Sequence, residues 1–213
     1  SNRHRADPNR RPSHLMSQRI AIIGGGAAGF MAAISAKTHR RDAEVLLFEK
    51  SDKVLSKVRI SGGGRCNVTH ALAEPRKLAR HYPRGEIFLR KVFAQWGQPQ
   101  TVDWFARHGV ALKTEDDGRM FPMTDDSRTV VDALTGEAER LGVRIRLKST
   151  VSRMVRADDH WVITTPEGIA YVDRVVVATG GSPKPEGLEW LRALGHDIVP
   201  PVPSLFTFNL PDE

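Results

Sequence analysis

Short apolar runs and glycines divide the first part of the chain into alternating strand-like and helix-like segments. The run Ile20–Ile23 leads directly into a glycine-rich turn and then into an alanine-rich segment of helical propensity. A second apolar run, Val45–Phe48, comes after it. Strands that alternate with helices are typical of a parallel sheet covered by helices. The pattern therefore predicts an α/β fold.

The middle of the chain has a helical period. Between Pro75 and Gly109 one apolar stripe recurs at spacings of three and four residues, which predicts a helix that packs in the core; its members are Ile87, Phe88, Val92, Phe93 and Trp96. Thr101 is expected to cap a second helix. Val110–Leu112 is expected to form a short strand. A third helix, capped by Asp126 or Ser127, should pack on the sheet through one apolar face; that face holds Val130, Val131, Leu134, Ala138 and Leu141.

From Val143 onward the period changes to two. Short alternating runs separated by turns predict a small antiparallel β-meander; the runs are 143–147, 151–155, 161–163 and 169–172. Val175–Val177 is wholly apolar and β-branched, which predicts a buried parallel strand. It ends in small residues and glycines, Ala178–Gly181, which leave room for a ligand at the carboxyl edge of the sheet.

The turn after the first strand carries the glycine spacing of a dinucleotide site. Gly24, Gly26 and Gly29 occupy the positions of G-x-G-x-x-G, in which the glycines allow a sharp turn, a close pyrophosphate and tight packing of helix on strand. Glu49 ends the second strand, 49 − 29 = 20 residues after the last glycine, where a carboxylate can accept hydrogen bonds from a ribose diol. Because this acid would repel a further phosphate, we expect FAD or NAD rather than NADP. Lys50 beside it is expected to be solvated.

A second glycine-rich loop, Ser61–Asn67, follows. With the cations of Lys57 and Arg65 and the backbone of Gly62–Gly64, it suits an anionic or planar polar ligand. A flexible loop with a solvated arginine is the alternative, and the dinucleotide turn upstream favours a ligand contact. Cys66 could be a redox or nucleophilic residue activated by its basic neighbours, but simple packing is the favoured interpretation.

Composition and charge exclude several classes of protein. The net charge is +7, of which the leader at 1–15 supplies +3 through four arginines and one aspartate. This leader has no interleaved aromatic residues, so we expect no nucleic-acid partner. No apolar run approaches the length of a membrane helix, and no histidines or cysteines have metal-ligand spacing. The single cysteine, Cys66, fits a reducing cytoplasm.

With these motifs in place, the chain resembles the two-dinucleotide-binding-domain flavoproteins, and specifically the BaiN/RdsA-like family of NAD(P)/FAD-dependent oxidoreductases. The stretches that carry the resemblance are IAIIGGGAAGFMAA, FEK, KVRISGGGRCNVTH, GRMFPMTDDSRTVVDAL, VVVATGG and LGHDIVPPVPSLF. They extend from Ile20 to Phe206, and the SGGGRCN loop is the most specific of them.

The resemblance implies an FAD-binding Rossmann-like domain, with a parallel sheet, flanking helices and a small antiparallel meander, over residues 16–199. A flexible leader or expression remnant would precede it at 1–15, and 200–213 would begin a linker to a substrate-side domain that this chain lacks. The implied cofactor contacts are Gly24, Gly26, Ala27, Ala28, Gly29, Glu49, Lys50, Lys57, Ser61, Gly63, Gly64, Arg65, Cys66, Asn67, Val151, Ala178, Thr179, Gly180 and Gly181. Val151 would reach the adenine through its backbone.

The activity implied is hydride transfer between a small organic substrate and NAD(P)H or dioxygen through the flavin, with no catalytic acid or base identified. The isolated chain is expected to hold FAD weakly, or not to turn over by itself. Two rival interpretations stay open: an NAD-dependent dehydrogenase, which would share the first turn but would not need the SGGGRCN loop, and a non-catalytic nucleotide-binding module. The oligomeric state and the substrate are not predicted.

Overall fold

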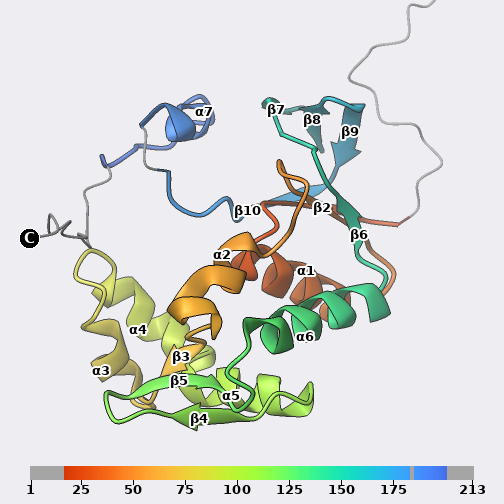
Figure 1. Cartoon of the computed structure of the whole chain (residues 1–213). Helices are drawn as coiled ribbons and strands as arrows, with labels where there is room; N and C mark the ends of the chain where they lie inside the picture. Colours follow the sequence, from red (N-terminus) through yellow and green to blue (C-terminus); the bar gives the residue numbers. More distant parts are fainter. Residues whose placement is uncertain (1–16, 183–184, 201–213) are drawn as a thin grey trace, which may run out of the picture.

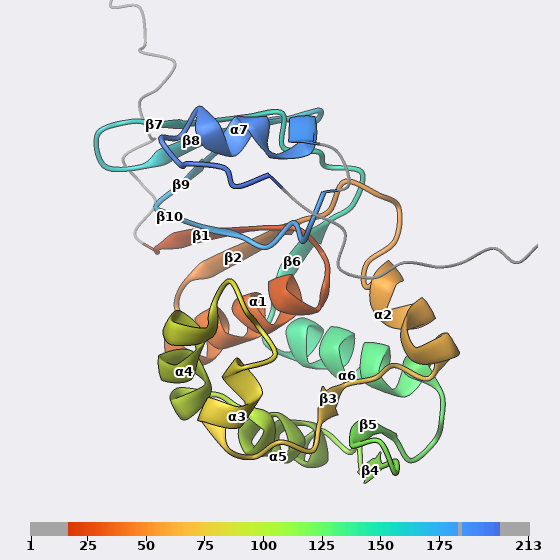
Figure 2. The same ribbon diagram turned by 90° about the vertical axis from the view of Figure 1, so that its left-hand side faces the viewer.

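The computed structural model describes residues 17–182 and 185–200 of the 213 in the chain, and Figures 1 and 2 show it in two views. The predicted leader at 1–15 and nearly all of the predicted linker therefore lie outside the described residues. The domain division stays a prediction.

A four-stranded sheet with every neighbouring pair parallel lies at the centre of the fold, in the strand order β10-β1-β2-β6. Its strands are β1 (Arg19–Ile23), β2 (Glu44–Phe48), β6 (Arg144–Arg146) and β10 (Arg174–Val177). Ile23 is in register with both Phe48 and Val177, so the carboxyl ends of these three strands meet at one edge. The predicted parallel sheet is confirmed, and the run at 143–147 belongs to it rather than to the meander.

Two long helices cover one face of this sheet, α1 (Ala27–His39) and α6 (Ser127–Arg140) (Figure 2). Side chains alternate along the strands, so Ile22 and Leu47 pack under these helices while Ile23 and Phe48 face the other way. Asp126 caps α6 as predicted, because its carboxylate accepts a hydrogen bond from the Arg128 N–H at 2.8 Å.

The opposite face packs on the predicted antiparallel meander, which consists of β7 (Arg153–Arg156), β8 (Trp161–Thr165) and β9 (Gly168–Val172) in that order. Ile163 and Val172 are fully buried there against Ile23 and Phe48. The short helical elements η2 (Pro185–Leu188) and α7 (Glu189–Arg192) follow, and Trp190 joins the same apolar cluster. The fold is the α/β arrangement that the sequence predicts.

A largely helical excursion leaves the sheet between β2 and α6. It contains α2 (Ser56–Ile60), the 3₁₀ turn η1 (Ser61–Gly64), β3 (Thr69–His70), α3 (Pro75–Ala79), α4 (Glu86–Gln95), α5 (Gln98–Arg107), β4 (Leu112–Thr114) and β5 (Arg119–Pro122). The three strands form a second antiparallel sheet in the order β3-β5-β4. The sequence pattern predicts only one of them, β4, as the short strand expected at Val110–Leu112.

The prediction that the α4 stripe lies in the core is wrong. Ile87 is 81% exposed and Phe88 72%, and α4 buries no residue completely. Spacing decides which side chains share a helical face, but it does not decide whether another element covers that face. The opposite side of α4 makes the packing contact, where the Phe93 ring lies 5.6 Å from that of Tyr82.

Two smaller expectations also differ from the structure. Thr101 does not cap α5, which begins three residues earlier, after Gly97; the Thr101 hydroxyl instead donates back to the Gly97 carbonyl at 2.9 Å. Val176 and Val177 are 39% and 40% exposed rather than buried, because β10 is an edge strand of the described sheet.

Candidate functional site

Two glycines of the first turn are required by the fold itself. Gly24 has a φ of +113°, and a Cβ there would lie 2.4 Å from the carbonyl oxygen of Ala178. A Cβ on Gly29 would lie 1.8 Å from the carbonyl oxygen of Gly24. Both distances are far below contact, so these positions must be glycine for the helix, the turn and β10 to come together.

No contact within the described chain requires a glycine at position 26. Its φ of −88° and ψ of −176° are extended backbone that any residue adopts. A Cβ on Gly26 would meet nothing within 4 Å. The space in front of this residue is therefore open from outside, as it must be if a ligand approaches the backbone there.

The amino terminus of α1 faces this open space. The first helical hydrogen bond runs from the Phe30 N–H to the Gly26 carbonyl, and the exposed Ala27 and Ala28 donate their N–H groups to no described residue. The first turn of the helix contains no acidic side chain. Free N–H groups at the positive end of a helix dipole form a site for an anion such as a pyrophosphate.

Glu49 lies between the glycine turn and the loop after β2. One carboxylate oxygen accepts the Gly25 N–H at 2.8 Å, and the other accepts both the N–H and the hydroxyl of Ser51 at 2.8 Å. Burial alone would raise the pKa of this carboxyl, but the hydrogen bonds from Ser51 and Gly25 outweigh it and lower the pKa below its ordinary value. Three of about four acceptor positions are filled, which leaves one for a ribose hydroxyl.

Gly25 and Ser51 are the site residues that the sequence reasoning missed. Gly25 is buried, and a Cβ there would lie 2.9 Å from the Glu49 carboxylate. The signal was present in the sequence as a fourth glycine inside the motif and a serine two residues after the acid, where Asx-like and Ser turns form.

The other two predicted segments meet the glycine turn at the same edge of the sheet. The Ala178 N–H donates to the Ile23 carbonyl at 2.8 Å, and the Leu55 N–H donates to the Gly25 carbonyl at 2.8 Å, just before α2. The Lys57 ammonium lies 3.8 Å from where a Cβ of Gly180 would stand. Thus the turns at 24–29 and 178–181 and the amino terminus of α2 are neighbours in space (Figure 1).

Arg65 is directed away from this edge. Its guanidinium lies 4.0 Å from the centre of the Phe121 ring and makes ion pairs with Glu115 at 2.5 Å and Asp125 at 3.6 Å. A Cβ on Gly62 would lie 2.7 Å from the same ring. The Arg65 side chain therefore anchors the loop to β5, and the expected contacts of Arg65 and Lys57 with a ligand stay predictions.

Cys66 is buried, as the favoured interpretation expected, and belongs to the core beneath α1 and α6. Burial raises the pKa of its thiol, which a contact with the Ser61 hydroxyl offsets only in part. The thiol is therefore protonated at neutral pH and is a poor nucleophile.

This burial gives a direct test of reactivity. Cys66 in the native chain is expected to react with iodoacetamide at pH 7 at least about tenfold more slowly than in the urea-unfolded chain, because the thiolate is disfavoured and covered. Mass spectrometry of timed samples measures both rates. Equal rates in the two states would restore the reactive-cysteine interpretation.

The remaining predicted cofactor contacts lie at the same edge of the sheet or in the loops beside it. Exposed positions are Lys50, Gly63, Asn67, Thr179 and Gly181, while Ser61, Gly64 and Val151 are half-buried. Gly63 and Gly64 have φ values of +68° and +87°, with open space where a side chain would stand. Within the described part of the chain, neither backbone group of Val151 has a hydrogen-bond partner.

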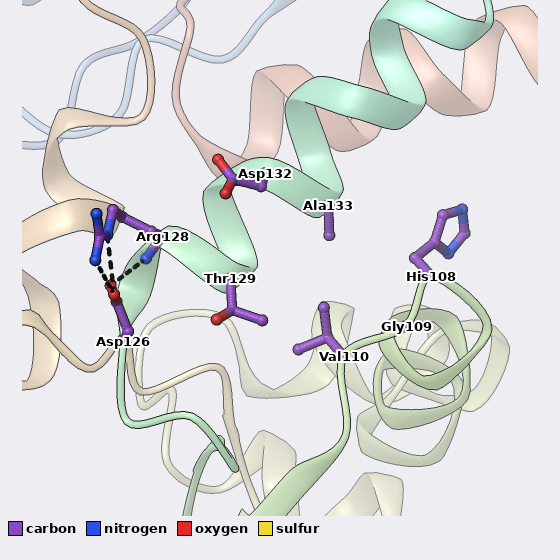
Figure 3. Close-up of a pocket in the computed structure, with 8 residues that line it drawn as sticks. All are labelled: His108, Gly109, Val110, Asp126, Arg128, Thr129, Asp132 and Ala133. Atoms are coloured by element: carbon purple, nitrogen blue, oxygen red, sulfur yellow. Dashed lines mark hydrogen bonds and ion pairs between the residues drawn. The ribbon is translucent and has the colours of Figure 1, made fainter.

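A separate hollow of about 540 Å³ lies between α6 and the turn after α5 (Figure 3). Its lining residues are His108, Gly109, Val110, Asp126, Arg128, Thr129, Asp132 and Ala133. Asp126 pairs with Arg128 at 2.8 Å rather than facing the hollow as a free acid. None of the predicted contacts lines it, so this hollow is distinct from the glycine-turn site.

Over residues 17–182 and 185–200, no three His, Cys, Asp or Glu side chains gather in a way that could hold a metal ion. Within the same residues, none of the helices combines the length and the apolar character that crossing a membrane requires.

The sheet, the glycine turn and the acid at the end of β2 define a dinucleotide-binding Rossmann domain of the type found in flavin-dependent oxidoreductases. The sequence profile of the HI0933-like protein Rossmann domain matches residues 18–203. The chain belongs to this family, in agreement with the resemblance found in the sequence.

Curated relatives share this domain. The chain is 32% identical over 193 residues to a 3-dehydro-bile acid delta(4,6)-reductase of Clostridium scindens, covering 88% of this chain and 46% of the relative. It is 30% identical over 196 residues to a ribosomal RNA dihydrouridine synthase of Escherichia coli, covering 89% and 47%. The chain thus spans about half the length of the curated relatives that it matches.

Among solved structures, the fold is similar to a 3-ketosteroid-delta4-(5alpha)-dehydrogenase from Rhodococcus jostii RHA1. The TM-score is 0.59 at 17% identity, over 81% of this chain and 48% of that one. At this level of identity the likeness concerns the fold alone.

Proposed function

We propose that this chain is the FAD-binding portion of a flavin-dependent oxidoreductase. The observation that carries the proposal is Gly26, a glycine with ordinary backbone angles and open space before it, at the free amino terminus of α1. A glycine with no internal role is explained if a pyrophosphate approaches its backbone.

The cofactor would be held by groups from all three segments. The N–H groups at Ala27 and Ala28 would bind the pyrophosphate, and the open acceptor position of Glu49 would receive a ribose hydroxyl. The backbone groups of Val151 are available to the adenine. The predicted contacts of Lys50, Ser61, Asn67 and the turn at Ala178–Gly181 belong to the same proposal.

When bound, FAD supplies the capacity to accept or donate a hydride, and the protein contributes binding, orientation and electrostatics. Lys57 is the cation placed to stabilise negative charge near the turn at Gly180. No catalytic acid or base is assigned among the described residues.

We propose a small organic molecule as the substrate, with NAD(P)H or dioxygen as the other redox partner. The relatives do not decide this, because one is named for a bile acid and the other for ribosomal RNA. The basic leader has no interleaved aromatic residues, which argues against a nucleic-acid partner, and the buried, free Cys66 fits a cytoplasmic location.

Ligand identification on the purified chain tests the proposal. We expect either a flavin absorbance spectrum or, after addition of FAD, saturable quenching of FAD fluorescence, with NAD binding at least about tenfold more weakly. Mass spectrometry of the denatured protein identifies any molecule that copurifies. Preferential binding of NAD would support the dehydrogenase alternative. A chain that binds neither would support the non-catalytic module, or a need for residues outside this chain, and would sink the proposal for the chain alone.

A further inference from the structure

The segment at 147–152, which joins β6 to β7, passes the end of β2. The N–H of Lys148 donates to the carbonyl of Ser51 at 2.8 Å, and the N–H of Ser149 donates to the carbonyl of Glu49 at 2.9 Å. These two hydrogen bonds hold the segment beside the acid that is proposed to bind the adenosine ribose.

Val151, in the same segment, has free backbone groups. Within the described residues, neither its N–H nor its carbonyl has a hydrogen-bond partner. Its side chain packs against the apolar cluster that includes Ile163 and Val172. The next residue is also fixed, because the N–H of Ser152 donates to the carbonyl of Thr164 in β8 at 3.0 Å. One donor and one acceptor are thus held close together, which suits the polar edge of a nucleobase.

Glu167, in the turn between β8 and β9, connects the meander to this segment. Its Oε2 atom accepts hydrogen bonds from the hydroxyl of Ser149 at 2.9 Å and from the hydroxyl of Thr165 at 3.0 Å. Ser149 is 2% exposed, so its hydroxyl needs a partner within the chain. The hydrogen bond from Ser149, together with that from Thr165, lowers the pKa of Glu167 below its ordinary value. The carboxylate is therefore charged at neutral pH, and a charged acceptor forms a stronger hydrogen bond than a neutral one.

We propose that Glu167 is a positioning residue for the adenine end of the cofactor, because it holds Ser149 and thereby fixes the backbone of Val151. This inference rests on the proposed FAD site and adds to it a residue outside the predicted contacts. Adenine carries an amino donor at position 6, which the Val151 carbonyl can accept, whereas hypoxanthine carries a carbonyl acceptor there. A fixed Val151 backbone therefore favours adenine over hypoxanthine, and a loosened one loses that preference.

Hydrogen exchange tests the positioning role without any ligand. Glu167→Ala is expected to speed exchange of the Ser149 amide severalfold, because the segment loses its contact with the meander. Asp158→Ala is the matched control, since Asp158 is exposed in the other turn of the meander and its side chain has no partner among the described residues. Residue-resolved NMR measures both variants. Equal Ser149 exchange in Glu167→Ala and in the parent chain would overturn the proposal.

Nucleotide binding tests the consequence for the base. ADP and IDP differ only in the base, and calorimetry is expected to show at least about tenfold tighter binding of ADP by the parent chain. Glu167→Ala should reduce this preference to about threefold or less, whereas Glu167→Gln, which keeps an acceptor oxygen, should retain most of it. A role in general stability alone would weaken both nucleotides equally and leave the preference unchanged.

The two measurements separate this inference from the proposed function. A parent chain that binds neither ADP nor FAD would contradict the proposed cofactor site, and the exchange of Ser149 would still decide whether Glu167 positions the segment. Binding of ADP with the same preference over IDP in the parent chain and in Glu167→Ala would overturn the role of Glu167 and leave the FAD site intact.

Discussion

Replacing Gly29 with alanine is expected to destabilise the domain severely and to abolish FAD binding with it. The new Cβ would stand 1.8 Å from the carbonyl oxygen of Gly24, and neither atom belongs to a flexible side chain. Relief requires α1 to move away from the turn, at a cost of about 3 kcal/mol or more. Urea or thermal unfolding followed by circular dichroism measures the loss.

Gly26→Ala is the matched control in the same motif. Its Cβ would meet nothing within 4 Å and the backbone needs no change, so we expect stability within about 0.5 kcal/mol of the parent chain. The methyl group would nevertheless stand where the pyrophosphate is proposed to lie, and FAD affinity should fall at least about tenfold. A stable Gly29→Ala variant would contradict the packing argument, whereas full FAD affinity in Gly26→Ala would contradict the proposed site.

Glu49→Ala is expected to weaken both FAD binding and folding. The buried Gly25 N–H would lose its acceptor, which costs about 1–3 kcal/mol, and the ribose would lose its partner. We expect an FAD affinity lower by about tenfold or more, measured by fluorescence titration alongside thermal unfolding. Ser51→Ala is the control, because it removes the hydrogen bonds of the hydroxyl to Glu49 and Lys53 and keeps the carboxylate.

The pH dependence of Glu49 follows from its lowered pKa. A carboxyl whose pKa is lower in the folded chain than in the unfolded chain stabilises the fold above the unfolded value, about 4.3 for glutamate, and loses that contribution as the pH falls through the folded value. Glu49→Ala should therefore be destabilised less at pH 3 than at pH 7. An equal destabilisation at both pH values would argue against the carboxylate as the acceptor.

The sequence predicts correctly those parts of the fold that depend on residues close together along the chain. The apolar run before Gly24 forms a strand that enters the tight turn, as predicted, and Asp126 caps α6 through its own neighbouring backbone. The acid 20 residues after the last glycine of the motif was predicted from spacing, and the structure places it against the glycine turn through Gly25.

The errors arise where a side chain's environment depends on distant segments. The stripe at Ile87 and Phe88 has the correct helical spacing, yet its exposure depends on whether another segment reaches it. The Arg65 guanidinium contacts Phe121, Glu115 and Asp125, at least 50 residues away along the chain, so these partners could not be predicted from the loop, and its contact with a cofactor stays a prediction. No local pattern contains that information.

The close contact between Gly24 and Ala178 has a consequence for the order of folding. These residues are 178 − 24 = 154 positions apart, so the turn cannot reach its final geometry until β10 has joined β1. Pairings between distant segments are slow to form, because a long loop must close before they contribute. During synthesis, the glycine turn at 24–29 can therefore reach its final geometry only after almost all of the described chain has been made.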